Sequence, residues 1–142
     1  MFYGAQILSY KRLGEVHSLA LRMAWDGLHR PEESTQLLLG LDNGLHGYAT
    51  RRFEGSRRFI FNAELRPTFY RHRWYTVAGV FFLDAGAAWV AGSTPENLRW
   101  SPGLGLRLGL PWVYNTPVWR LDLARDTTSD IWRLSVGLGP YF

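Results

Sequence analysis

The residues of this sequence that could do chemistry are charged side chains set between apolar ones. Glu64, Asp84 and Arg107 each have an apolar residue on both sides in the chain. Opposite charges on neighbouring strands can pair across a sheet, and a carboxylate removed from water needs such a partner. These positions therefore favour ion pairing and the docking of another segment over the making or breaking of bonds.

Catalytic, metal and cofactor sites are not expected. The sequence has no cysteine, and its histidines show no ligand spacing with one another or with carboxylates, which excludes a thiolate site and disfavours any other metal site. A Gly-x-Ser-x-Gly elbow is absent, so a hydrolase is unsupported. Gly103-x-Gly105 continues a strand pattern and opens no helix, so a nucleotide loop is not expected either. We predict no enzyme and no cofactor.

Basic charge raises the question of a nucleic-acid partner. The chain carries a formal charge of +4, and all of its basic residues except Lys11 are arginine. These arginines are spaced by two along strand patterns and alternate with carboxylates, which indicates a wall of crossed ion pairs rather than a nucleic-acid stripe. Arg51-Arg52 and Arg57-Arg58 flank a long loop, where they could touch anionic lipopolysaccharide or be solvated loop charge.

The elements that must position these charges are β-strands. Apolar residues recur with a period of two nearly everywhere, most clearly where Leu104, Leu106, Leu108 and Leu110 alternate with Gly and Arg. The chain is expected to be all-β and antiparallel, with a long loop over 28–56. Seven strands are predicted, at about 2–12, 15–27, 57–67, 73–90, 100–111, 117–126 and 131–142. A further strand within 33–41 is an alternative that would disrupt the loop.

Alternation alone fits two opposite structures, a soluble barrel with leucines inside and a membrane barrel with leucines facing lipid. Three features favour the membrane barrel. The predicted strands are longer than the usual five or six residues, the connections alternate between short and long, and Trp and Tyr collect near strand ends. These aromatic residues are Trp25, Trp74, Tyr75, Trp89, Trp100, Trp112, Trp119 and Tyr141.

Four motifs carry a resemblance to a known family. Leu45-His46-Gly47-Tyr48 lies in the long loop, Phe82-Leu83-Asp84-Ala85-Gly86 and then Gly103–Arg107 lie in strands, and Phe142 closes the chain. In order and spacing they resemble the C-terminal barrel half of the BamA/TamA-type outer-membrane insertase and translocator superfamily, the bacterial surface antigen family. The resemblance covers about residues 30–142.

The resemblance implies how the loop is held. In that family the loop folds back into the lumen, and an Arg of its motif pairs with the Asp of the strand motif. Phe82, Asp84 and Gly86 would face the lumen here, with Arg107 and Glu64 on the same face. His46 stands in place of the family's Arg and lacks its bidentate fork. A protonated His46 could substitute for it in part, and Arg107 or Arg66 could be the partner of Asp84 instead.

An odd number of strands does not close an ordinary antiparallel barrel. The first and last of seven strands run in the same direction, and no secretory signal is recognisable at the N-terminus. We therefore expect the whole chain, 1–142, to be one domain that forms an incomplete barrel, the C-terminal part of a longer protein. The alternative is a divergent gene whose start is misassigned.

The function expected from the resemblance is protein assembly (insertase) or polypeptide translocation in the bacterial outer membrane. The expected partners are a client polypeptide, the barrel assembly machinery, and outer-membrane lipid with lipopolysaccharide. Two alternatives stay open, a membrane anchor for a patatin-like lipase and a soluble ligand-binding β-barrel.

Overall fold

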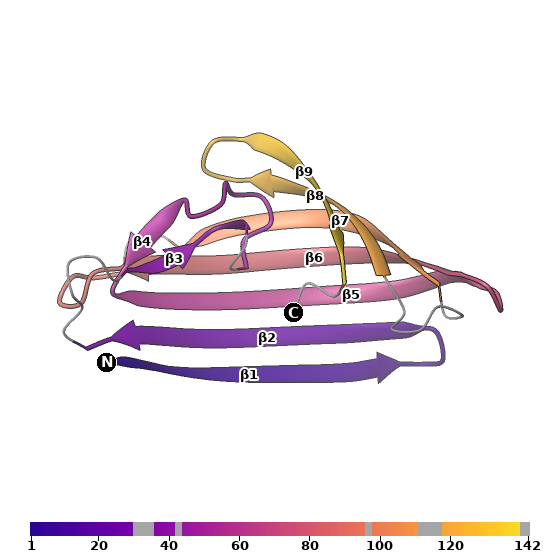
Figure 1. Cartoon of the computed structure of the whole chain (residues 1–142), viewed down its shortest axis with the longest axis horizontal. Helices are drawn as coiled ribbons and strands as arrows, with labels where there is room; N and C mark the ends of the chain where they lie inside the picture. The colour runs from indigo at the N-terminus through magenta and orange to yellow at the C-terminus, as the bar shows by residue number, and fades with distance from the viewer. Residues whose placement is uncertain (30–35, 42–43, 96–97, 111–117, 140–142) are drawn as a thin grey trace.

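A single large antiparallel sheet dominates the computed structural model of this chain, which describes residues 1–29, 36–41, 44–95, 98–110 and 118–139. Its seven strands follow the order β1-β2-β5-β6-β7-β8-β9, so that each strand pairs with its nearest long neighbour in the chain (Figure 1). The strands are β1 (Phe2–Leu13), β2 (His17–Leu28), β5 (Arg57–Arg71), β6 (Thr76–Trp89), β7 (Arg99–Gly109), β8 (Val118–Asp126) and β9 (Ile131–Leu138). The prediction of an all-β antiparallel class with seven long strands is confirmed.

The largest difference from the predicted bounds lies between β5 and β6. A turn was expected over 67–73, but β5 continues to Arg71 and β6 begins only at Thr76. The pairing shifts register between Thr68 and Tyr70, which marks a β-bulge. A bulge takes up one extra residue in one strand, and pairing resumes at Tyr70 opposite Val77. The strand therefore passes through the expected turn.

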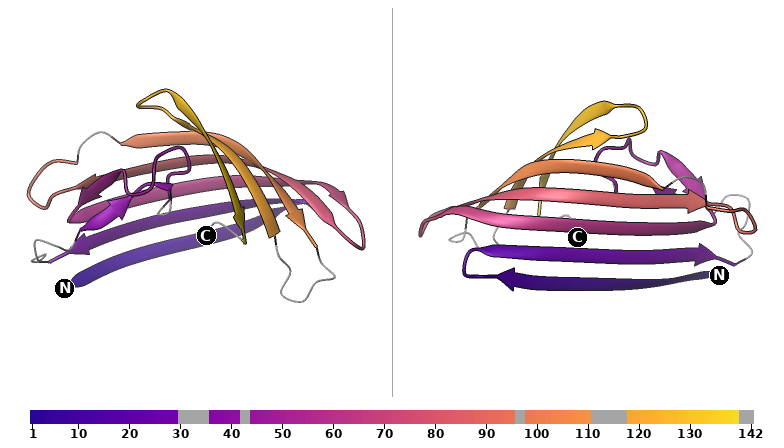
Figure 2. Two further views of the ribbon diagram at one scale, coloured as in Figure 1. Left: turned by 45° about the horizontal axis from the view of Figure 1, so that its top comes forward. Right: turned by 180° about the vertical axis from the view of Figure 1, so that it is seen from behind.

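The sheet exposes its apolar face and buries its polar face. Leu104, Leu106 and Leu108 of β7 are 49%, 50% and 40% exposed, whereas Asp84 of β6 is fully buried and Glu64 of β5 is 1% exposed. Figure 2 shows that the sheet curves and that β8 and β9 bend over one of its sides. The polar side chains point toward this concave side, and the leucines point away from it.

The long loop also contains a small sheet of its own. β3 (Leu37–Leu39) pairs with β4 (Phe53–Gly55) in an antiparallel ladder separate from the large sheet. The alternative of a further strand within 33–41 is therefore wrong for the large sheet, because Leu37–Leu39 pairs inside the loop. Leu39 is fully buried and packs with Ala24 and Ile60 of the large sheet, so the loop lies on the concave face.

The described residues contain no helix long and apolar enough to cross a membrane.

Candidate functional site

Three polar side chains form a row across the three central strands, on the concave face. Asn62 of β5 lies opposite Asp84 of β6, and Asp84 lies opposite Ser101 of β7. Residues directly opposite in a sheet point to the same face, so all three side chains project to the concave side. Each is fully buried. We call Asn62, Asp84 and Ser101 the loop clamp.

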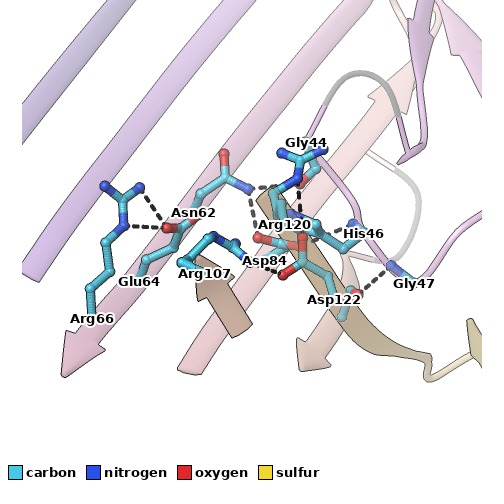
Figure 3. A network of polar contacts seen from close by, with 11 residues as sticks. Gly44, His46, Gly47, Asn62, Glu64, Arg66, Asp84, Arg107, Arg120 and Asp122 are labelled. Carbon is cyan, nitrogen blue, oxygen red and sulfur yellow. Dashed lines mark hydrogen bonds and ion pairs between the residues drawn. The ribbon is translucent and has the colours of Figure 1, made fainter. Parts of the chain in front are cut away.

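The loop clamp holds the main chain of the long loop (Figure 3). Asn62 Nδ2 donates a hydrogen bond of 2.7 Å to the carbonyl oxygen of Gly44. The His46 amide donates to Asp84 Oδ2 at 3.0 Å, and the Gly47 amide donates to Ser101 Oγ at 2.7 Å. Asn62 Nδ2 also donates to Asp84 Oδ1 at 2.7 Å, which fixes the carboxylate. Three adjacent strands thus contribute one side chain each to a single docking site.

His46 adds its side chain to the same carboxylate. Its Nδ1 lies 2.6 Å from Asp84 Oδ2, and its ring packs against Phe82 with centroids 4.3 Å apart. A carboxylate that orients a histidine through Nδ1 is also found in catalytic triads. Here the histidine is only 1% exposed. The pair is thereby suited to anchoring the loop, because a substrate would have no access to the ring.

The two arginines considered as partners of Asp84 pair with other carboxylates instead. Arg107 Nη1 lies 2.5 Å from Asp122 Oδ1, with Arg120 on the other oxygen of Asp122 at 3.3 Å. Arg66 binds Glu64 at 2.6 Å. Of the three alternatives for the partner of Asp84, His46 is therefore the one that the structure confirms.

The register explains this pairing. Asp84 lies opposite Ser101, about 20 Å along β7 from Arg107, whereas Asp122 lies opposite the neighbouring Gly105. Arg107 and Glu64 were predicted to dock the loop, but they form ion pairs elsewhere on the concave face.

The remaining residues of the loop motif are also buried against the sheet. Leu45 and Tyr48 are fully buried. The Tyr48 hydroxyl donates to the carbonyl oxygen of Trp100 at 3.2 Å and lies 3.1 Å from Thr128 Oγ1. A Cβ added at Gly47 would lie 2.4 Å from the carbonyl oxygen of Arg125. Only glycine allows the loop backbone to approach β8 this closely.

The glycine of the strand motif has a similar role under the small sheet. A Cβ at Gly86 would lie 3.1 Å from Leu39 Cδ2, tighter than an ordinary contact. Phe82, Asp84 and Gly86 thus all face the loop, through the His46 ring, the His46 amide and Leu39 respectively. Phe142, the fourth motif, lies outside the described residues, as do Trp112 and Tyr141.

Asn62 and Ser101 were not recognised from the sequence as site residues. The alternation placed Asn62 on the same face as Glu64, but only the strand register brings it beside Asp84. The signal that could have identified Asn62 and Ser101 is the alignment of the predicted strands as antiparallel hairpins, which gives the cross-strand neighbours of Asp84. The bulge in β5 and the unexpected length of the β5–β6 hairpin shift that alignment.

Space remains between the docked loop and the last strand. A cavity of about 390 Å³ is bounded by loop residues that include Tyr48 and Thr50 and by Arg133 and Ser135 of β9. Its lining is partly polar and partly apolar. Within the part of the chain that the structure describes, no three His, Asp or Glu side chains are grouped so as to hold a metal ion.

Comparison of this chain with protein-family models, with curated proteins and with solved structures finds no match.

Proposed function

We propose that this chain is the membrane-spanning part of an outer-membrane β-barrel that inserts or translocates polypeptides, with the long loop as a displaceable plug. The observation that carries the proposal is the loop clamp. A sheet with an apolar exterior holds a loop on its polar face through three buried side chains, Asn62, Asp84 and Ser101.

The exposed leucine face supports a position in a bilayer. In a soluble barrel these side chains would fill the interior, but Leu104, Leu106 and Leu134 are 49%, 50% and 66% exposed. Lipid would remove this apolar surface from water. This pattern favours the membrane barrel over the soluble ligand-binding barrel.

Aromatic side chains near both ends of the sheet support the same position. Trp25, Trp100 and Trp132 are exposed toward the end that carries the long loop, and Trp74 and Trp119 toward the other end. β6 has 14 residues and is about 46 Å long. At a tilt of about 45° such a strand spans about 33 Å, which matches the hydrocarbon core of a bilayer, about 30 Å thick.

The strength of the loop clamp suits a plug that must move. Each of its hydrogen bonds contributes about 0.5–1.5 kcal/mol net. Burial of Leu45 and Tyr48 adds about 1.5–3 kcal/mol each before the loop's ordering entropy is subtracted. Each contribution is small, so a client segment that offers its own main-chain donors to Asp84 and Ser101 could compete with the loop.

The first test removes the central carboxylate. In Asp84→Ala, the loop loses both bonds between His46 and the carboxylate, and Asn62 loses its hydrogen bond to the same carboxylate. Hydrogen exchange at the His46 and Gly47 amides should therefore speed up by tenfold or more. The sheet itself should persist, as judged by heat-modifiable migration on a gel. In the intact protein, secretion or assembly should be impaired.

The matched control is Glu64→Gln, which changes another buried carboxylate of the concave face that is paired with Arg66. It should leave the exchange of the loop amides unchanged. Unaltered secretion or assembly in Asp84→Ala, with the loop shown to be undocked, would exclude a plug function and leave the role of a membrane anchor.

A further inference from the structure

The end of the sheet opposite the long loop carries a group of exposed cations. Lys11, Arg12, Arg71 and Arg73 lie at or beside the turns β1–β2 and β5–β6, and all are exposed. We call these four residues the basic rim. Glu15 is the only carboxylate in the segments 9–18 and 66–76. The basic rim thus has a net positive charge of its own.

Cations of the concave face are engaged differently. Arg58, Arg66 and Arg107 each bind a carboxylate of the sheet. Among the described residues, the four side chains of the basic rim have no such ion pair. Their charge is therefore available to a partner outside the chain.

Aromatic rings lie directly beside the basic rim. Tyr70 and Tyr75 stack with centroids 5.6 Å apart, and His72 packs against both. The guanidinium of Arg73 lies 4.6 Å from the centre of the Trp74 ring. The β5–β6 hairpin that carries them extends past the β1–β2 turn, which contacts it through the bond from the Thr68 amide to the Val16 carbonyl oxygen (Figure 1).

This aromatic group continues the apolar outer face of the sheet. Phe69 is 62% exposed and covers Gly79, where an added Cβ would lie 2.5 Å from its ring. Further along the same face of β6, Phe81 is 54% exposed. From the middle of β6 to the tip of the β5–β6 hairpin, apolar side chains therefore give way to amphipathic rings with cations among them. This is the order met on passing from hydrocarbon through the interface to the phosphates of a lipid bilayer.

We propose that the basic rim binds the phosphate headgroups of anionic phospholipids. This inference rests on the proposed membrane-spanning function and names the lipid class that one end of the sheet contacts. Aromatic and basic residues together also occur in proteins that bind single-stranded nucleic acid. The continuity of the rings with the leucine face favours lipid, because a nucleic-acid site has no need of an adjoining apolar belt.

The test compares matched double variants of the full chain refolded into vesicles. Arg71→Gln/Arg73→Gln removes two cations of the basic rim, and Arg51→Gln/Arg52→Gln removes two exposed cations beside β4, in the long loop. Partitioning is measured into vesicles of phosphatidylcholine alone and of phosphatidylcholine with phosphatidylglycerol. The unaltered chain should prefer the anionic vesicles, and added salt should weaken that preference.

Loss of the two rim cations should reduce the preference for anionic vesicles by about tenfold or more, since each cation near a charged bilayer contributes about fivefold. The loop variant should keep it. The inference would be overturned if both variants lost the preference equally, or if the unaltered chain had no preference for anionic vesicles. Insertion of the unaltered chain into the vesicles would still support the proposed function. Rim-dependent binding of a labelled single-stranded oligonucleotide without any vesicle preference would also overturn it. Failure to insert into either kind of vesicle would overturn both proposals.

Discussion

Docking of the loop depends on main-chain atoms more than on the side chain of His46. The His46 and Gly47 amides and the Gly44 carbonyl are the groups bound by the loop clamp. His46 contributes twice to docking, because its amide supplies one bond to Asp84 and its ring supplies another.

Gly47 provides a sharp test of this close approach. In Gly47→Ala the new methyl group would lie 2.4 Å from the Arg125 carbonyl oxygen and 2.6 Å from Ser101 Oγ. Overpacking of this kind costs about 1–3 kcal/mol, so the loop should undock and its amides should exchange faster. Hydrogen exchange followed by mass spectrometry would measure this.

Gly109→Ala is the appropriate comparison for Gly47→Ala, because a Cβ at that position meets nothing within 4 Å. It should leave the loop protected. If both variants exchanged alike, the close approach of the loop to β8 would be refuted.

At the scale of the elements, the long strands could be predicted from their period of two, since apolar and polar residues alternate over their whole length. The sequence also placed Phe82, Asp84 and Gly86 on one face. The small sheet of β3 and β4 could not be predicted in the same way. Its strands have only three residues each, too few to show a period, and they are stabilised by the large sheet beneath them.

The strand register was the second quantity that alternation left undetermined. A period of two gives the face of each residue but not its cross-strand neighbour. Arg107 and Asp84 share a face, and only the observed pairing shows that they lie about 20 Å apart along β7. The ion pairs around Asp122 and the clamp partners Asn62 and Ser101 follow from that register.

The outward face of β7 offers a prediction about its surroundings. In Leu104→Arg, a charge would replace an exposed leucine at the middle of the strand. If this face meets hydrocarbon, folding into vesicles should be destabilised by about 2–4 kcal/mol, as measured by denaturant titration. In water, an exposed substitution would change the free energy of unfolding by only about 0.5 kcal/mol.

Leu98→Arg controls for the arginine itself, because Leu98 precedes β7 and is also exposed. Near the interface the expected cost is about 0–1 kcal/mol. Equal costs at the two positions would argue against a bilayer around β7.

At the scale of the whole molecule, the sheet has two edges, β1 and β9, among the described strands. Every neighbouring pair of the seven strands is antiparallel, so these edges run in the same direction. They cannot pair antiparallel with each other. Antiparallel closure of the proposed barrel requires an odd number of strands from another source.

Unpaired edges should be visible in the exchange of backbone amides. Alternate residues of β1 direct their amides away from β2, so about half of the β1 amides should exchange rapidly in detergent while those of β5 and β6 are protected. Protection that rises with protein concentration would indicate pairing of edges between copies. Complete protection of β1 at every concentration would contradict an open edge.

The long loop enters and leaves the sheet at a single point. The Leu28 amide donates to the Ser56 carbonyl oxygen at 2.8 Å, where β2 and β5 already pair as direct neighbours. The loop is thus an insert within an otherwise ordinary hairpin, tethered at a common hinge. It can move away from the concave face without breaking a strand pair of the large sheet. For the same reason, the loop can change in length or sequence during evolution while the large sheet stays the same.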